Sequence, residues 1–161
     1  MRDNKMSSQE ITDFLLSKKD GVLCTVGEDG YPYGAPMNYV YLDGMFVFHG
    51  RRVGDKIGNL RREPKACFTV YDSKGFEVYG DESCDTCTIY RSVVARGDFV
   101  EITNDEEKAN LLKKLVDSVI PERSGDPMPP KAVTATGVYV LKPVSITGKH
   151  HVPAAGNHIL P

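Results

Sequence analysis

The sequence is best approached from Phe46-Val-Phe-His-Gly-Arg-Arg-Val-Gly-Asp-Lys-Ile-Gly-Asn-Leu-Arg-Arg-Glu-Pro64, where a predicted strand runs directly into a predicted helix. Bulky residues from Met45 to Phe48 are typical of a buried strand. Further along, apolar residues occur at helical spacing, and Glu63-Pro64 ends the predicted helix. The apolar positions that define this helix are Val53, Ile57 and Leu60.

The junction between this strand and this helix combines glycines with basic residues. Gly50 and Gly54 allow a ligand to approach the backbone, and a helix N-terminus presents unpaired N–H groups with a partial positive charge. Lys56, in the first turn, opposes the helix dipole and loses some stability there unless an anion compensates. We therefore predict that the junction binds the phosphate of a cofactor, with a plain solvated face as the alternative. The other bases of the junction are Arg51 and Arg52.

The composition is that of one domain of ordinary size with a substantial core. The chain has 161 residues, of which 40% are hydrophobic and 26% charged, and its formal net charge is -2. This balance gives no electrostatic argument for binding nucleic acid or an anionic membrane. No apolar run is long enough to span a bilayer, and the polar N-terminal segment lacks the core of a signal peptide. We therefore expect a cytoplasmic protein.

The four cysteines fall into two kinds of sequence context. Cys24 and Cys67 lie within apolar strand patterns, where a free cysteine behaves as a small hydrophobic residue. Cys84-Asp-Thr-Cys87 has the spacing of a redox dithiol or of half a zinc site. A zinc site would need further ligands, which His150 and His151 could supply if the tail folds back. We expect free thiols and no metal, and keep zinc and redox chemistry as alternatives.

Most of the chain predicts strands joined by tight turns. A capping box at Ser7-Ser-Gln-Glu10 opens a first helix that continues to about Ser17. Gly27-Glu-Asp-Gly30 has hairpin chemistry, and Pro32 and Pro36 in the next strand indicate an edge or a bulge. The predicted strands are Gly21–Val26, Tyr31–Leu42, Met45–His49, Lys65–Tyr71, Thr88–Ile102 and Ala132–Thr147.

The second half of the chain adds a helix, a loop and a tail. Thr103-Asn-Asp-Glu106 caps a helix whose apolar residues extend to Val119. Residues 121–130 predict a loop, and residues 73–86 form the least regular part of the chain. The tail after Gly148 has little pattern, so we expect it to be disordered alone or packed on a partner.

One α+β domain accounts for these elements. Tight turns make the strand pairing mostly antiparallel, and about six strands of this length can close into a small barrel that removes exposed edges. Two or three helices would lie outside this barrel.

Several motifs occur in an order and at a spacing that resemble a known family. They are Gly21-Val-Leu-Cys-Thr-Val, Asp29-Gly-Tyr-Pro-Tyr-Gly-Ala-Pro-Met-Asn-Tyr-Val, Phe46-Val-Phe-His-Gly, Gly54-Asp-Lys-Ile-Gly-Asn-Leu-Arg-Arg-Glu-Pro and Tyr90-Arg-Ser-Val-Val-Ala-Arg-Gly97. Together they resemble the FMN-binding split-barrel family related to pyridoxamine 5′-phosphate oxidase, and within it the nitroimidazole-resistance (NimA-like) branch. The resemblance implies that residues 1–161 form a single FMN-binding split-barrel domain, with a core of about 10–149 and a tail of 150–161.

The resemblance implies a six-stranded antiparallel split β-barrel with flanking helices, and a homodimer with two FMN sites at the interface. In such families the phosphate meets basic and polar residues from the strand–helix junction and from a neighbouring strand. Matched to this chain, these residues are Lys56 and Ser92, with Arg91 nearby, and the junction glycines Gly50 and Gly54 let the cofactor approach.

Other matched positions would surround the rest of the cofactor. Asn38 and Tyr39 match positions that line the isoalloxazine side, and His49 matches a strand end that faces the pocket. Tyr90 would stack on the flavin, although Tyr39 and Tyr90 are equally explained as core or interface aromatics. Likewise, His49 is either a catalyst or a hydrogen-bonded packing residue. The motif Ile146-Thr-Gly-Lys149 also matches the family.

The resemblance implies an FMN-dependent oxidoreductase that reduces a small acceptor such as a nitroaromatic or 5-nitroimidazole compound. Ala35-Pro-Met-Asn-Tyr39 stands where the true oxidase has a run of basic residues, which argues against vitamin B6 oxidation. The alternative is a flavin- or haem-binding carrier or sensor without turnover, with His49 as a haem ligand. A related deazaflavin enzyme is a third reading.

Overall fold

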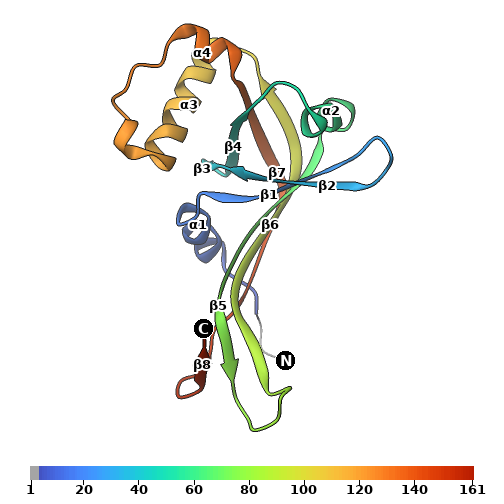
Figure 1. Ribbon diagram of the computed structural model, residues 1–161, viewed down its shortest axis with the longest axis vertical. Helices are drawn as coiled ribbons and strands as arrows, with labels where there is room; N and C mark the ends of the chain where they lie inside the picture. The colour runs from blue at the N-terminus through green and yellow to red at the C-terminus, as the bar shows by residue number, and fades with distance from the viewer. Residues whose placement is uncertain (1–3) are drawn as a thin grey trace.

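The computed structural model describes residues 4–161 and contains one mostly antiparallel sheet with helices around it (Figure 1). Within this range no helix is long and apolar enough to cross a membrane. The elements are α1 (Ser8–Leu16), β1 (Asp20–Val26), β2 (Pro32–Asn38), β3 (Val40–Leu42), β4 (Met45–Gly50), α2 (Asp55–Arg62), β5 (Lys65–Val78), β6 (Thr86–Ile102), α3 (Asp105–Val119), η1 (Pro121–Arg123), α4 (Pro130–Ala135), β7 (Gly137–His151) and β8 (His158–Leu160).

The sheet has eight strands, two more than the six predicted. Its order is β2-β1-β5-β6-β7-β4-β3, with β8 paired to β5 outside this path. One extra strand arises because the predicted strand 31–42 divides at Tyr39. There the backbone N–H of Tyr39 bonds Lys19 before β1, whereas Val40 already pairs with Val47 of β4. The chain thus changes partner strand at Tyr39, which makes β2 and β3 separate elements.

Two hydrophobic clusters lie on opposite sides of the sheet. The first packs α1 against the aromatic interior, where Phe46, Phe48 and Phe68 are completely buried. Their rings meet at tilted or edge-on angles with centroids 4.9–5.2 Å apart. The second packs α3 and α4 against β3, β4 and β7 around Leu115 and Val138. The predicted capping box is confirmed, because Ser7 and Glu10 bond each other's backbone N–H at the start of α1.

The segment 73–86, predicted as the least regular, is strand at residues 73–78 and 86 and a turn at 79–85. β5 continues to Val78 beyond a bulge between Ser73 and Phe76, and β6 begins at Thr86. The two strands form a long hairpin that projects from the end of the molecule opposite α3 and α4 (Figure 1). The irregular pattern was misleading because β6 and β8 both supply backbone partners to this part of β5.

The tail folds back onto its own chain, a point that the sequence left open. β7 runs on to His151, the next residues form a connection, and β8 returns to pair with Phe76–Val78. The buried carboxylate of Glu77 accepts hydrogen bonds from the Ala154 backbone (2.7 Å), the Asn157 amide and the His151 ring (2.6 Å). These contacts, led by the Ala154 N–H, lower the pKa of Glu77.

The predicted strand 132–147 begins later than expected. Residues 130–135 form α4 instead, because Pro130 suits the first turn of a helix and Val133 packs into the second cluster. Within the predicted loop 121–130, η1 forms a short turn. The helix predicted from Thr103 begins at Asp105, where the Asn104 side chain accepts a bond from the Glu107 backbone.

Candidate functional site

The strand–helix junction forms as predicted except at Val53, which lies before α2 and is 72% exposed, whereas Ile57 and Leu60 are buried. β4 ends at Gly50 and α2 begins after Gly54, whose φ of 110° is a backbone conformation that favours glycine. Among residues 4–161, no side chain caps the first turn of α2. The Ile57 and Gly58 N–H groups bond the Gly54 carbonyl. The Asp55 and Lys56 N–H groups are therefore the ones available to an external acceptor, although the Asp55 side chain supplies one negative charge in the same turn.

Lys56 is the unusual residue of this junction. Its ammonium Nζ lies 3.5 Å from the Met37 Sδ and about as far from where a Cβ at Gly50 would stand. Burial lowers the pKa of Lys56. In the part of the chain that the structure describes, no carboxylate forms a salt bridge with it. A partly buried cation without a counter-ion is a favourable binding site for an anion.

His49 stands beside Lys56 at the end of β4. Its backbone pairs with Val138 of β7, and its side chain is exposed on the protein surface. Neighbouring protein groups desolvate the ring in part, and this effect together with the charge of Lys56 lowers the pKa of His49. His49 is therefore a neutral imidazole near neutral pH, able both to donate and to accept a hydrogen bond.

Asn38 is the last residue of β2 and Tyr39 follows it, but the two have different environments. The Asn38 side chain is exposed and donates to the Lys19 carbonyl at 3.3 Å. Tyr39 is completely buried, its hydroxyl donates to the Leu15 carbonyl at 2.7 Å, and its ring packs edge-on against Phe68. In this structure Tyr39 acts as a core residue, which is the alternative that the sequence left open, while Asn38 is accessible to a ligand.

The remaining predicted residues lie in the middle of β6. Successive strand residues point to opposite faces, so Arg91 faces α1 while Tyr90 and Ser92 face away from it. Arg91 donates to Asp72 at 3.4 Å and lies 4.9 Å from the centre of the Phe14 ring. These internal contacts satisfy Arg91. Because it lies on the opposite face from Ser92, the two side chains of one protomer do not converge on one phosphate.

The junction and the middle of β6 present their side chains on different faces. Lys56 contacts Met37, whose side chain belongs to the buried core cluster, whereas Ser92 faces away from the core. His49 is aligned through Val138 with Ile102, at the end of β6, and Ser92 lies ten residues back along the same strand. Lys56 and Ser92 of one protomer therefore do not face the same side of the sheet.

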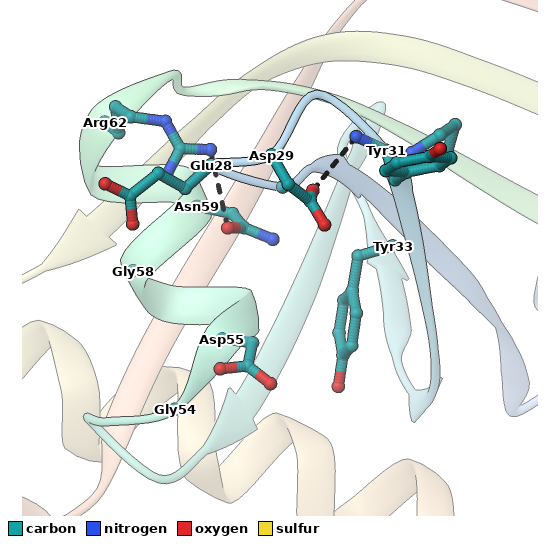
Figure 2. A pocket seen from close by; sticks show the side chains of 11 residues that line it. Glu28, Asp29, Tyr31, Tyr33, Gly54, Asp55, Gly58, Asn59 and Arg62 are labelled. Atoms are coloured by element: carbon teal, nitrogen blue, oxygen red, sulfur yellow. Dashed lines mark hydrogen bonds between the residues drawn. The ribbon is translucent and has the colours of Figure 1, made fainter.

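A cavity of about 600 Å³ opens between the β1–β2 turn and α2 (Figure 2). The side chains of Asp29, Asp55 and Tyr33 point into this space, and Arg62 lies at its edge (Figure 2). Its acidic lining disfavours a phosphate, so we do not assign it to the cofactor phosphate. From the sequence only a hairpin turn is predicted here, and its local pattern does not indicate the cavity, which includes Gly54 of the predicted set. The residues that line it are Gly27, Glu28, Asp29, Tyr31, Pro32, Tyr33, Gly54, Asp55, Gly58, Asn59 and Arg62.

The cysteines are free thiols, as expected. Cys84 lies in the exposed turn between β5 and β6, and Cys87 follows in β6. The tail does fold back, but His151 bonds Glu77 rather than joining these thiols. Among residues 4–161, no group of three or more His, Cys, Asp or Glu side chains could hold a metal ion. The zinc alternative thus has no support in the described chain.

Comparison with known proteins agrees with the architecture. The sequence profile described as pyridoxamine 5′-phosphate oxidase matches residues 7–150. A candidate 5-nitroimidazole antibiotic resistance protein from Bacteroides thetaiotaomicron is 26% identical, with a TM-score of 0.74 over 90% of this chain and 85% of that one. A FAD- and haem-binding protein from Mycobacterium smegmatis is 25% identical, with a TM-score of 0.81 over 92% of this chain and 73% of that one.

The fold extends to less similar proteins. The flavocytochrome Anf3 from Azotobacter vinelandii is 23% identical, with a TM-score of 0.79 over 92% of this chain and 70% of that one. A search of curated protein sequences found no match. Since the family profile spans nearly the whole sequence, the chain belongs to the pyridoxamine 5′-phosphate oxidase-like family.

Proposed function

We propose that this protein is an FMN-dependent oxidoreductase that reduces a small acceptor such as a nitroaromatic compound. The observation that carries the proposal is Lys56, a partly buried cation without a carboxylate partner in the described chain, beside an uncapped helix start. A flavin phosphate would supply the missing negative charge and accept bonds from the Asp55 and Lys56 N–H groups at the start of α2. The family match and the structurally similar FAD- and haem-binding protein from Mycobacterium smegmatis support a flavin as the group that carries this phosphate.

The different faces on which Lys56 and Ser92 lie support a homodimer with shared sites. If both residues hold one cofactor, the junction of one protomer would face the middle of β6 of its partner. Tyr90 and Ser92 lie on the sheet face away from α1, where a second protomer could pack. In this arrangement Arg91, on the other face, supports the fold of its own protomer and leaves the phosphate to Lys56 and Ser92.

The side chains at the junction would have separate roles, some in binding the cofactor and one in orienting the acceptor. FMN, when bound, supplies the electron transfer, while the protein positions it and excludes water. Lys56 neutralises the phosphate, and the exposed Asn38 amide is free to bond the ring edge. His49 is neutral at physiological pH and orients the acceptor by hydrogen bonding, because neutral imidazole has one donor and one acceptor.

The first test is the visible spectrum of the purified protein, before and after titration with FMN, FAD or haem. We expect flavin bands and saturable binding of FMN, followed by flavin-dependent reduction of a nitroaromatic by NADH or NADPH. A protein that binds no flavin at any concentration overturns the proposal. Flavin binding without turnover of any acceptor supports the carrier reading instead.

Mixing two variants tests the shared site. Lys56→Ala and Ser92→Ala homodimers each have two defective sites, but a mixed dimer has one site with both defects and one intact site. Random mixing should therefore restore normal FMN affinity at about a quarter of the sites. If both residues served a site within one protomer, mixing would restore none, and light scattering that shows only monomers would exclude the dimer.

The second candidate function is a haem- or flavin-binding protein without turnover. The neighbour from Mycobacterium smegmatis binds both FAD and haem, and the exposed His49 could serve as an axial ligand in this chain. A Soret band in the purified protein that is lost in the His49→Ala variant would favour this candidate. Flavin bands alone would favour the oxidoreductase.

A further inference from the structure

Cys24 and Cys67 lie directly opposite each other on neighbouring strands. They are register partners in the antiparallel pairing of β1 with β5, and side chains of such partners point to the same face. Opposite Cα atoms in antiparallel strands are about 4.5–5.5 Å apart, within the range that a disulfide bridges. From the sequence, both cysteines are predicted to act as small hydrophobic residues within strands. In the structure both side chains are partly exposed.

The face on which the two thiols lie follows from the burial of their neighbours. Ala66 and Phe68 on β5 point into the core, so Cys67 between them points outward. On β1 the adjacent Leu23 points into the core, so Cys24 also points outward. The alternation of buried and exposed residues along β5 was visible in the sequence. The missing information was the pairing of β1 with β5, which brings residues from distant parts of the chain together.

A cavity of about 690 Å³ lies over this thiol pair. Its lining includes two cations, Lys65 and Arg96, and one carboxylate, Asp98. In the described chain neither cation forms a salt bridge, and the Arg96 Nε donates only a long bond to the Ser145 hydroxyl at 3.4 Å. The cavity therefore carries a net positive charge, which favours entry of a small anionic molecule.

We propose that Cys24 and Cys67 form a reversible cross-strand disulfide by exchange with an anionic low-molecular-weight disulfide of the glutathione disulfide class. The opposed thiols supply the bridge, and the cationic cavity admits the reagent. Closing the bridge ties the β1–β2 hairpin covalently to the centre of the sheet. This redox site does not depend on flavin binding, so failure of the proposed function leaves it unaffected.

The exchange proceeds in two balanced steps. The Cys67 thiolate attacks one sulfur of the disulfide, and one small thiol leaves with the proton that Cys67 lost. The Cys24 thiol then loses its proton and attacks the Cys67 sulfur of the mixed disulfide, which releases the second small thiol. Two protein thiols are oxidised and one small disulfide is reduced to two thiols. Burial and the neighbouring Cys67 raise the pKa of Cys24, which lowers its thiolate fraction. Cys24 is therefore assigned the second attack, which is intramolecular.

The test uses the full chain in glutathione buffers of increasing oxidised fraction, followed by alkylation of free thiols and peptide mapping. The background variant Cys84→Ser/Cys87→Ser removes the other two thiols. In this variant we expect the titratable thiols to fall from two per chain to none, with Cys24 and Cys67 in one linked peptide pair. Reduction with dithiothreitol should restore both thiols. In wild-type protein the same linkage should be found, so the test survives poor folding of the variant.

A further variant separates the two steps. With Cys24→Ser added to the background variant, Cys67 should accumulate as a mixed disulfide with glutathione, and no internal bridge should form. The proposal is overturned if both thiols stay free in fully oxidised buffer, or if only mixed disulfides appear while both cysteines are present. Linkage between two chains, or from either cysteine to Cys84 or Cys87 in wild-type protein, would also contradict it.

Discussion

Lys56 at the strand–helix junction and Arg91 in the middle of β6 are both cations that the sequence placed near a phosphate, yet their surroundings differ. Arg91 has a carboxylate partner in Asp72 and an aromatic partner in Phe14. Lys56 has only the Met37 sulfur as a polar partner in the described chain, and burial lowers its pKa. The protein itself supplies partners for Arg91, whereas for Lys56 the proposed phosphate would supply the partner.

This difference shows how to separate binding cations from structural ones. Asp72 accepts hydrogen bonds from Lys18, which follows α1, and from Arg91 on β6, and Lys18, more than Arg91, lowers the pKa of Asp72. A cation in such a network contributes to the fold and gains little from an added anion. A desolvated cation without a carboxylate gains a charge-assisted contact when an anion binds. Substitutions at the two sites should therefore change different properties.

The largest expected effect is the loss of FMN affinity in Lys56→Ala. Removing a charge-assisted contact to the phosphate should cost about 1.5–3 kcal/mol, or roughly ten- to a hundredfold in Kd. Fluorescence titration of FMN into the apoprotein measures this change. The matched control is Lys114→Ala, an exposed lysine on α3, which should bind FMN like the wild type. Equal affinity of the two variants would remove Lys56 from the phosphate site.

Arg91→Ala should show the reverse pattern. Loss of the contacts to Asp72 and Phe14 should lower the free energy of unfolding by about 1 kcal/mol, with FMN affinity nearly unchanged. Chemical denaturation and FMN titration on the same samples measure both quantities. Arg96→Ala serves as control, because Arg96 is exposed on the other face of the same strand. A large loss of FMN affinity in Arg91→Ala alone would return this residue to the cofactor site.

The two regions also differ in how far the sequence could predict them. The junction is local: a strand, two glycines and an amphipathic helix within twenty residues identify Lys56 and His49, and the structure brings the two together. The partners of Arg91 are not local, since Phe14 belongs to α1 and Asp72 to β5. Periodicity places Arg91 on a strand but cannot say which helix covers its face.

Long-range pairing also explains the other errors. β8 and the outer part of β5 exist as strands because Phe76 pairs with Leu160, and neither segment has a strong pattern alone. The partial exposure of Cys24 and the internal role of Tyr39 depend on neighbours from distant strands. The fold class could be predicted because alternation and turn chemistry are local properties of the sequence.

Tyr39→Phe extends the comparison to a residue that the sequence placed beside the flavin. Its buried hydroxyl donates to the Leu15 carbonyl, so the variant should lose about 1 kcal/mol of unfolding free energy. FMN affinity should stay the same, because the ring remains in the core. Tyr31→Phe, at a highly exposed tyrosine, provides the control for both measurements and should alter neither. A change in FMN affinity without a change in stability would show that Tyr39 contacts the cofactor.

The smallest effect concerns the ionisation of His49. Desolvation and the Lys56 charge both disfavour the imidazolium form and hold the pKa of His49 below its usual 6.5. Lys56→Ala removes the repulsion but not the desolvation, so the pKa should rise part of the way towards 6.5. NMR titration of the imidazole resonances measures this shift, and Arg91→Ala should leave the His49 pKa unchanged.

The lowered pKa of His49 also makes the stability of the folded protein depend on pH. Because the folded-state pKa of His49 is lowered, the unfolded chain binds more protons as pH falls below about 6.5, and His49 then disfavours the folded state. Lys56→Ala should weaken this acid destabilisation. If FMN phosphate neutralises Lys56, adding FMN to the wild-type protein should likewise raise the His49 pKa. A pKa that responds to neither change would place the ammonium too far from His49 for the two to share one site.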